Sequence, residues 1–188
     1  MINNLVNKKR QRGVTLVEML ITLAIAAILL TLVAPNVQSI LTKNKITAEI
    51  NELSGLLQFA RYTAIDEQTT AVVCPSTDFA TCSNDWNAPK IVFIDDNDNN
   101  TRDGAERLLL TSQTISSTNK MTSSGNIIRF LDSGGAETAI NMKLCPNSKD
   151  AKFGRALFVS LQGRTRISAD SNNDGVHEDV AGNNLSCT

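Results

Sequence analysis

The sequence predicts an α+β protein in which one long N-terminal helix packs on mostly antiparallel β-sheets. Three patterns predict it: an apolar run from Val14 to Ala34, apolar residues spaced three or four apart as far as Ala64, and a period of two beyond Gln68. The first two patterns are typical of helices and the third is typical of strands. A helix followed by strands indicates an α+β arrangement. The 188 residues suffice for one membrane helix and one globular domain.

The apolar run from Val14 to Ala34 is long enough to cross a membrane. About 20 helical residues span the roughly 30 Å hydrocarbon core of a bilayer. Four basic residues precede the run: Lys8, Lys9, Arg10 and Arg12. A basic flank of this kind stays on the cytoplasmic side. The sequence therefore predicts three parts, namely residues 1–13, a transmembrane helix at 14–35, and a globular domain at 36–188 across the membrane.

Two residues distinguish this segment from a secretory signal or a simple anchor. A secretory signal has a short apolar core followed by a small-residue cleavage site, whereas Gly13 comes before the apolar run. Glu18 places a carboxylate inside the run, and an ionisable group at such a depth is costly and usually has a partner. The alternative is an interfacial glutamate on a plain membrane anchor.

Residues 36–66 are expected to continue the helix beyond the membrane. Their apolar residues recur every three or four positions and form one face of an amphipathic helix: Ile46, Ile50, Leu53, Leu57, Ala60 and Ala64. Charged residues fall mostly on the other faces. The first half of the helix is therefore expected to be a membrane anchor and the second half to support a sheet.

Strands are expected beyond Gln68, where alternating and β-branched residues replace the helical pattern. Gly, Asn, Ser and Asp separate them. The expected ranges are 70–74, 90–95, 106–115, 126–131, 138–145, 155–162 and 164–168. Between the last two, Gln162 and Gly163 are predicted to form a tight turn, because glycine adopts positive φ at little cost.

The charge of the chain argues against bulk electrostatic binding of nucleic acid. The formal net charge is −1, and residues 1–13 carry four cations and no acid, so the remainder has a net charge of −5. A net negative protein does not attract nucleic acid as a whole. Any such binding has to come from a local patch.

Four cysteines lie beyond the apolar run, in the part that the basic flank sends across the membrane. Disulfides are the expected state in an oxidising compartment. Of the three possible pairings we favour Cys74 with Cys82, which close a short loop, and Cys145 with Cys187, which would pin the C-terminal tail to a strand. Zinc is not expected, because the chain has no CxxC pair and contains only one histidine, His177.

Gly13 followed by Val14-Thr15-Leu16-Val17-Glu18 resembles the class III leader of type IV pilins and pseudopilins. The resemblance implies that a prepilin peptidase cleaves after Gly13 and that the new amine of Val14, where the family usually has phenylalanine, is methylated. It also implies that Glu18 neutralises the amine of a neighbouring subunit, and that Pro35 is a helix-kinking proline. Residues 1–13 are then a cleaved leader. The rest is an inner-membrane protein with a periplasmic domain that enters a pilus or pseudopilus.

The part after the helix resembles the GspH/FimT family of minor pilins and pseudopilins. The signs are Cys74-Pro75-Ser76 with Cys82 and Trp86 after it, an Asp/Asn-rich turn after a strand, Leu144-Cys145-Pro146, and a late Gly-Arg-x-Arg. The resemblance implies a type IV pilin-like fold. It also implies that the partners are other pilins or pseudopilins.

Gly163-Arg164-Thr165-Arg166 is the stretch best suited to binding. Strand side chains alternate, so Arg164 and Arg166 should project from one side about 7 Å apart, and each guanidinium can donate paired N–H groups to a phosphate. In the DNA-uptake minor pilins that this chain resembles, a GRxR motif at this place contacts DNA. Because phosphate contacts do not read bases, we expect binding of double-stranded DNA that is independent of sequence. Three nearby cations would widen the patch: Lys149, Lys152 and Arg155. The alternative is a solvated strand face paired with acids such as Asp170.

Two acidic loops match parts of an EF-hand calcium loop. The first match consists of Asp95, Asn97, Asn99 and Glu106, but Asn100 replaces the turn glycine. The second consists of Asp170, Asn172, Asp174 and Gly175, but Ala181 stands where the bidentate acid belongs. Hydrogen-bonded Asn/Asp turns explain both loops, so no metal is expected.

No catalytic activity and no cofactor are expected. His177 lies in a polar turn, and the chain has no GxSxG or phosphate-loop motif. The expected function is a minor pilin of a type IV pilus that assembles through its N-terminal helix and binds the DNA backbone for uptake. The main alternative is a GspH-like pseudopilin of a type II secretion system with protein contacts alone. A secreted calcium-binding surface protein is a third hypothesis.

Overall fold

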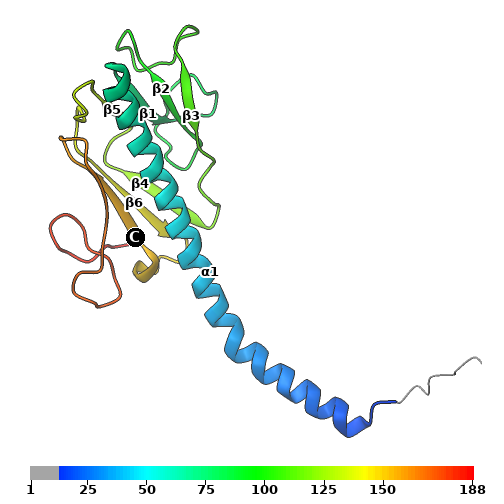
Figure 1. Cartoon of the computed structure of the whole chain (residues 1–188). Coiled ribbons are helices and arrows are strands. Elements are labelled where there is room, and N and C mark those ends of the chain that lie inside the picture. The colour runs from blue at the N-terminus through cyan, green and yellow to red at the C-terminus, as the bar shows by residue number, and fades with distance from the viewer. Residues whose placement is uncertain (1–12) are drawn as a thin grey trace, which may run out of the picture. The chain divides into compact units, whose positions relative to one another are not determined.

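The structure, a computed structural model, describes residues 13–188, without the side chains of residues 32–35. The chain divides into one unit that ends at Leu41 and a second, Thr42–Thr188. A single helix, α1 (Leu16–Glu67), runs through both (Figure 1).

The part of α1 up to Leu41 is apolar and exposed. Thr15 caps its start, because its hydroxyl accepts the N–H of Glu18 at 3.2 Å and satisfies a group that the first turn leaves unpaired. Leu16 and Leu30 are 77% and 69% exposed. Within the described residues, α1 is the helix long and apolar enough to span a membrane. The helical backbone continues through Pro35, whose side chain lies outside the described part, so the expected kink stays a prediction.

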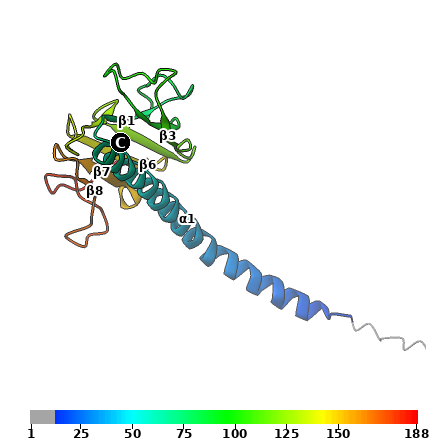
Figure 2. The same ribbon diagram turned by 45° about the horizontal axis from the view of Figure 1, so that its top comes forward.

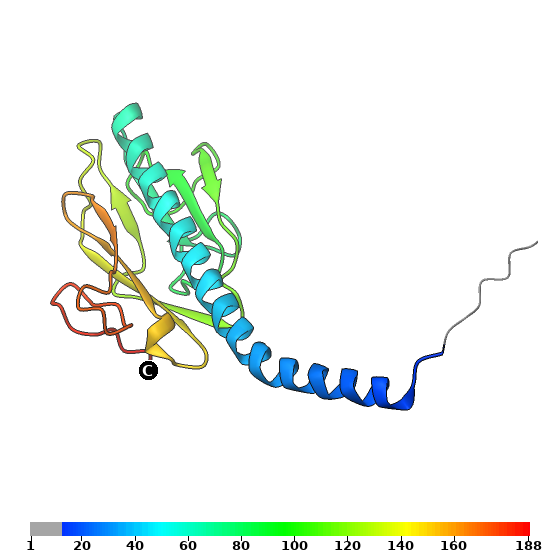
Figure 3. The same cartoon turned by 60° about the horizontal axis from the view of Figure 1, so that its bottom comes forward.

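In the second unit, two four-stranded antiparallel sheets are present among the described residues. The first sheet has the order β3-β2-β1-β5, with bounds Leu108–Thr111, Lys90–Ile94, Ala71–Pro75 and Ile128–Phe130. The second sheet has the order β4-β6-β7-β8, with bounds Asn119–Ser123, Ile140–Pro146, Arg155–Val159 and Thr165–Ile167. The turned views show the second half of α1 lying across strands of both sheets (Figures 2 and 3).

One face of α1 forms the centre of the core, as the helical spacing predicts. Each of its six members is at most 3% exposed: Ile46, Ile50, Leu53, Leu57, Ala60 and Ala64. They share one cluster with residues of both sheets, such as Val73 and Phe130 from the first and Met142 and Leu157 from the second. Fully burying a leucine or isoleucine side chain contributes about 1.5–3 kcal/mol. The helix therefore holds the two sheets together.

The two central strands of the first sheet are buried on both faces, whereas the edge strand β3 is partly exposed. Every residue of β1 and β2 is buried. The face away from α1 forms a second cluster with Val72, Cys74, Ile91 and Phe93, against which Cys82 packs. The loop closed by the Cys74–Cys82 disulfide thus covers this face.

The second sheet has one face in the core and one face toward solvent. Along β6, Ile140, Met142 and Leu144 are buried, whereas the intervening Asn141 and Lys143 point outward. The outward residues of β7, Ala156 and Phe158, are covered by Leu185 of the C-terminal tail. The Cys145–Cys187 disulfide ties that tail to β6, the pairing that the sequence favours.

The structure adds two elements that the sequence patterns did not predict. The first is β4, in which Met121 is the inward-facing large apolar side chain and the others are small or polar, so alternation is weak. The second is a short 3-10 helix, η1 (Ala151–Phe153), whose start is capped by Asp150. Each of the seven expected strands is present with shorter or shifted ends. The third is much shorter than 106–115, because its pairing with β2 extends only from Leu108 to Thr111.

Candidate functional site

The turn between β7 and β8 fixes the position of the Gly-Arg-x-Arg motif. Gly163 is buried with φ of 70°, and its N–H donates to the carbonyl of Ser160 at 2.8 Å. A Cβ at Gly163 would lie 2.0 Å from the carbonyl oxygen of Gly134. That same oxygen accepts a hydrogen bond of 2.7 Å from Nε of Arg61 on α1. Backbone conformation and close approach both require glycine here, and the turn is tied to the helix.

Arg164 and Arg166 are exposed and line the same open hollow of about 720 Å³. Arg166 pairs with Phe158 across β8 and β7, and its guanidinium carbon lies 5.2 Å from the centroid of the Phe158 ring. A cation–π contact of this kind holds a guanidinium against an apolar support. Phe158, Val159 and Val180 make the wall largely apolar. The hollow therefore presents two cations on an uncharged surface.

Arg155 does not belong to this surface, and its predicted contribution to the patch is wrong. Arg155 begins β7, whereas the arginine pair lies beyond the other end of that strand. Its Nη1 donates to the carbonyl of Gly154 at 2.7 Å and to that of Lys152 at 3.2 Å, and the residue is 8% exposed. Burial lowers the pKa of its guanidinium. Lys152 is exposed on η1, but neither it nor Lys149 lines the arginine hollow.

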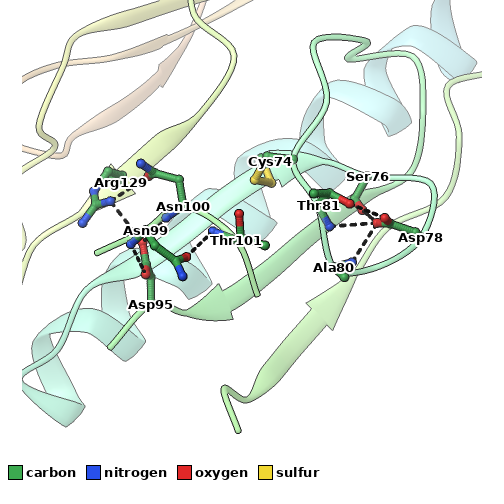
Figure 4. Close-up of a disulfide and its surroundings, with 11 residues drawn as sticks. Cys74, Ser76, Asp78, Ala80, Thr81, Asp95, Asn99, Asn100, Thr101 and Arg129 are labelled. Atoms are coloured by element: carbon green, nitrogen blue, oxygen red, sulfur yellow. Dashed lines mark hydrogen bonds and ion pairs between the residues drawn. A yellow bond between two sulfur atoms is a disulfide. The ribbon is translucent and has the colours of Figure 1, made fainter. Parts of the chain in front are cut away.

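The acids of the first Asp/Asn-rich loop bind backbone N–H groups and an arginine. Asp95 is buried and accepts the N–H groups of Asn99 and Asn100, each at 3.1 Å, and Nη1 of Arg129 at 3.0 Å (Figure 4). Glu106 closes the loop by accepting the N–H of Asp96 at 2.9 Å. These contacts are those of a hydrogen-bonded turn.

The second acidic loop is also held by carboxylates that accept backbone N–H groups. Asp170 accepts the N–H groups of Asp174 and Gly175, at 3.2 and 2.9 Å. Glu178, which is buried, accepts the N–H of Ser171 at 2.8 Å. Within residues 13–188, no group of three or more His, Cys, Asp or Glu side chains is arranged to hold a metal ion.

The loop closed by Cys74 and Cys82 is organised by Asp78. Its carboxylate accepts the hydroxyl of Thr81, the N–H of Ala80 at 2.9 Å, the N–H of Thr81 at 2.8 Å and the hydroxyl of Ser76 at 2.8 Å (Figure 4). These bonds, led by that from the Thr81 hydroxyl, hold the pKa of Asp78 well below its usual range. The loop is therefore a rigid cover for the first sheet.

His177 connects the tail to the second sheet. Its Nδ1 lies 2.7 Å from the carbonyl oxygen of Ser168 and 3.0 Å from the Ser168 hydroxyl. Burial lowers the pKa of the imidazole, as does the nearby charge of Arg155. The contact positions the tail.

The residues expected to direct processing and assembly lie at the start of α1. Gly13 and Val14 precede the helix and are exposed. Glu18 is exposed in the first turn, where its negative charge interacts favourably with the positive end of the helix dipole. The basic cluster of residues 8–12 lies outside the described residues.

A family model described as Type II transport protein GspH matches residues 49–163. The chain belongs to the GspH family. A second model, described as the prokaryotic N-terminal methylation motif, matches residues 8–34, which include Gly13, Val14 and Glu18. No curated protein sequence matches the chain significantly.

The fold of this GspH-family protein is similar to those of solved minor pilins and pseudopilins. The type IV minor pilin FimU of Pseudomonas aeruginosa is 18% identical, with a TM-score of 0.57 and coverage of 77% of this chain and 96% of that one. The minor pseudopilin EpsH from the type 2 secretion system of Vibrio cholerae is 11% identical, with a TM-score of 0.52 and coverage of 68% and 98%. The long helix on two antiparallel sheets is thus a type IV pilin-like fold. Minor pilins and pseudopilins are structural components, in which a soluble domain follows an apolar helix.

Sequence reasoning did not find Phe158, whose ring supports the guanidinium of Arg166. Its signal lies in the pairing of β7 with β8, which places residues 158 and 166 opposite each other. That register depends on the turn at Gly163 and cannot be predicted from the sequence of either strand alone.

Proposed function

We propose that this GspH-family protein is a minor pilin of a type IV pilus. A prepilin peptidase cleaves after Gly13, the amine of Val14 is methylated, and α1 holds the protein in the inner membrane with its domain in the periplasm until it enters the pilus. The match of residues 8–34 to the methylation motif supports this sequence of events. The exposed apolar surface of α1 up to Leu41 suits a bilayer and the helices of neighbouring pilins equally well.

Glu18 is proposed to pair with the N-terminal amine of a neighbouring subunit. Its exposed carboxylate lies four residues from Val14, among apolar side chains such as Val17 and Leu20. An ionised carboxylate in such surroundings is costly unless an opposite charge meets it. A free amine on the next helix supplies that charge.

The domain is further proposed to bind the DNA backbone through Arg164 and Arg166. The observation that carries this proposal is the presence of both exposed guanidiniums at one hollow, next to a turn that Gly163 holds rigid. Contacts with phosphates position a duplex without reading its bases, and they weaken as salt rises. Binding should therefore be independent of sequence and sensitive to salt.

Duplex binding by an Arg164→Ala/Arg166→Ala variant tests this role. The protein is the chain that begins at Val14, in a nonionic detergent, so that the four leader cations make no contribution. Each phosphate contact contributes about −0.9 to the slope of log K against log salt, so the variant should lose about two units of slope and most of its affinity. The matched control is Lys43→Ala/Lys45→Ala, which removes the same charge from exposed positions on α1. If the arginine variant binds like the wild type, these arginines are ordinary surface residues.

A second candidate function is that of a pseudopilin in a type II secretion system. The description of the matching family and the fold of EpsH favour it. Deletion of the gene in the host separates the two functions. Loss of surface pili with normal protein secretion indicates the minor pilin, and loss of secretion with normal pili indicates the pseudopilin.

A further inference from the structure

Three adjoining hollows form one groove across the outer face of the second sheet. The arginine hollow, which contains Arg164 and Arg166, shares Asn141, Phe158 and Val180 with a middle hollow of about 410 Å³. The middle hollow in turn shares Thr122 and Lys143 with a third hollow of about 530 Å³. The groove therefore runs from β8 across β7 and β6 to β4.

The far end of the groove also carries cations. Lys120, Lys143 and Lys149 line the third hollow, which we call the lysine hollow, together with the Cys145–Cys187 disulfide. Nζ of Lys143 donates to the carbonyl of Ser186 in the tail, which holds this ammonium group at the groove. The strand pattern explains the cluster, because Lys120 is paired with Cys145 and Lys143 with Thr122, all on the outward side of β4 and β6.

Acids contribute little to the groove. Among the described side chains that line it, Asp179 in the middle hollow is the one carboxylate. That carboxylate accepts the N–H groups of Ala181 and Asn183, at 2.8 and 2.9 Å, within its own turn. The three hollows therefore carry five cationic side chains against one carboxylate, and a neighbouring hollow that shares Arg166, Asp179 and Val180 adds Glu178.

Strand spacing gives the distance between the two cationic ends. Arg166, Phe158 and Asn141 lie in one row across three strands. Lys143 lies two residues farther along β6, and Lys120 lies on the next strand, opposite Cys145. With strands about 4.8 Å apart and residues about 3.4 Å apart, the Cα atoms of Lys143 and Lys120 are roughly 12 and 20 Å from that of Arg166. About 20 Å of duplex carries about six phosphates on each strand.

We propose that one DNA backbone lies along this groove, with its phosphates contacting the arginines at one end and Lys120, Lys143 and Lys149 at the other. The proposal rests on the DNA binding proposed above and extends its footprint from a pair of contacts to about five. A longer footprint explains how a domain of net negative charge retains a duplex, because each added phosphate contact raises affinity at low salt. The arginine pair anchors the strand, and the lysines fix its direction across the sheet.

The test compares salt slopes of duplex binding by Lys120→Gln/Lys143→Gln/Lys149→Gln and by its parent, both as the chain that begins at Val14 in nonionic detergent. The slope should fall by about 2–3 units, since each lost phosphate contact removes about 0.9. The control Lys43→Gln/Lys45→Gln/Lys152→Gln removes the same charge from exposed lysines outside the groove and should change the slope by less than one unit. Replacing the same three groove lysines by arginine should restore the slope, which separates loss of charge from loss of folding.

The outcomes separate this proposal from the arginine role. An unchanged slope in the lysine variant, with binding still dependent on Arg164 and Arg166, overturns the groove and leaves the arginine site in place. An equal fall in the control also overturns it, because the effect is then one of overall charge. If the parent chain binds no duplex, both proposals fail. If the lysine variant loses heparin binding but binds duplex as before, the ligand is a different polyanion and the groove proposal is wrong.

Discussion

At the scale of single residues, Gly163 decides where the two arginines lie. Its positive φ turns the chain from β7 into β8, and its missing Cβ lets the backbone approach the carbonyl of Gly134. Arg61 on α1 bonds that same carbonyl, so the turn is positioned by the core helix. The backbone that carries the two arginines is thus fixed before a ligand binds, which lowers the backbone entropy lost on binding.

Gly163→Ala should therefore destabilise the domain strongly. A non-glycine residue at such a φ costs about 1 kcal/mol or more, and the added methyl group would also meet a backbone oxygen. Gly182→Ala is the matched control, because Gly182 has φ of 86° but open space around its Cβ position. Urea unfolding should give a clearly greater loss for Gly163→Ala than for Gly182→Ala. Equal losses would show that the close approach to Gly134 contributes nothing.

The buried Lys90 should make the stability of the domain depend on pH. It is 2% exposed at the start of β2, and burial lowers its pKa to about 8, although Glu52 and Glu49 on α1 act in the opposite direction. In the unfolded chain the pKa returns to about 10.5, so between these two values the unfolded state binds more protons than the folded state. The free energy of unfolding therefore rises by about 3 kcal/mol in total as the pH increases from about 8 to about 10.5. This gain is lost as the pH falls back through the same window to the folded-state pKa of about 8.

Lys90→Met should remove that dependence and stabilise the domain at pH 7 by about 1–3 kcal/mol. The measurement is urea unfolding of the two proteins at pH 7 and pH 9.5, with disulfides intact. The gap between them should narrow at the higher pH. A constant gap at both values would show that Lys90 titrates alike in the folded and unfolded states.

At the scale of elements, the C-terminal tail completes the second sheet. Leu185 covers Ala156 and Phe158 on β7, and the disulfide from Cys187 fixes the tail to β6. The same tail supplies Val180 and Ser186 to the groove. The shape of the groove therefore depends on the disulfide as well as on the strands.

The two disulfides should stabilise the domain unequally. Cys145–Cys187 closes a separation of 42 residues and Cys74–Cys82 one of 8. Loop-closure entropy then gives about 4 kcal/mol for the first and about 2.5 kcal/mol for the second. Urea unfolding of Cys145→Ser/Cys187→Ser and Cys74→Ser/Cys82→Ser tests this order. An inverted order would mean that strain or residual structure outweighs loop length.

Local sequence patterns predicted elements whose buried face repeats regularly along the chain. The features that they missed depend on contacts between segments that are distant in the sequence. The spacing of Ile46 to Ala64 predicted the buried face of α1 because a helix repeats its exposure within a few residues. The strand β4 was missed, since one inward methionine is a weak signal. Arg155 was assigned to the surface because nothing in its neighbourhood shows that Lys152 and Gly154 bury its guanidinium. The lysine groove depends on the register of β4 with β6, which sequence alone does not provide.

At the scale of the whole molecule, an exposed apolar helical segment precedes an acidic domain with a cationic groove on its second sheet. The residues up to Leu41 and those from Thr42 form separate units, so the proposed assembly surface and the proposed DNA groove belong to different units. The methylation motif matches the first of these two parts, and the GspH family model matches the second. We propose that the chain is processed at Gly13 and enters a pilus through its new N-terminus.

Mass spectrometry of the intact protein recovered from sheared pili tests both the processing and the incorporation. The predicted mass is that of a chain that begins at N-methylated Val14 and contains two disulfides. Glu18→Ala should be cleaved and methylated in the same way in the membrane fraction, with a mass that differs only by the substitution, but little or none should be found in the pili, because the neighbouring amine loses its partner. An uncleaved chain in the pili, cleavage at another residue, or normal incorporation of Glu18→Ala would contradict the account.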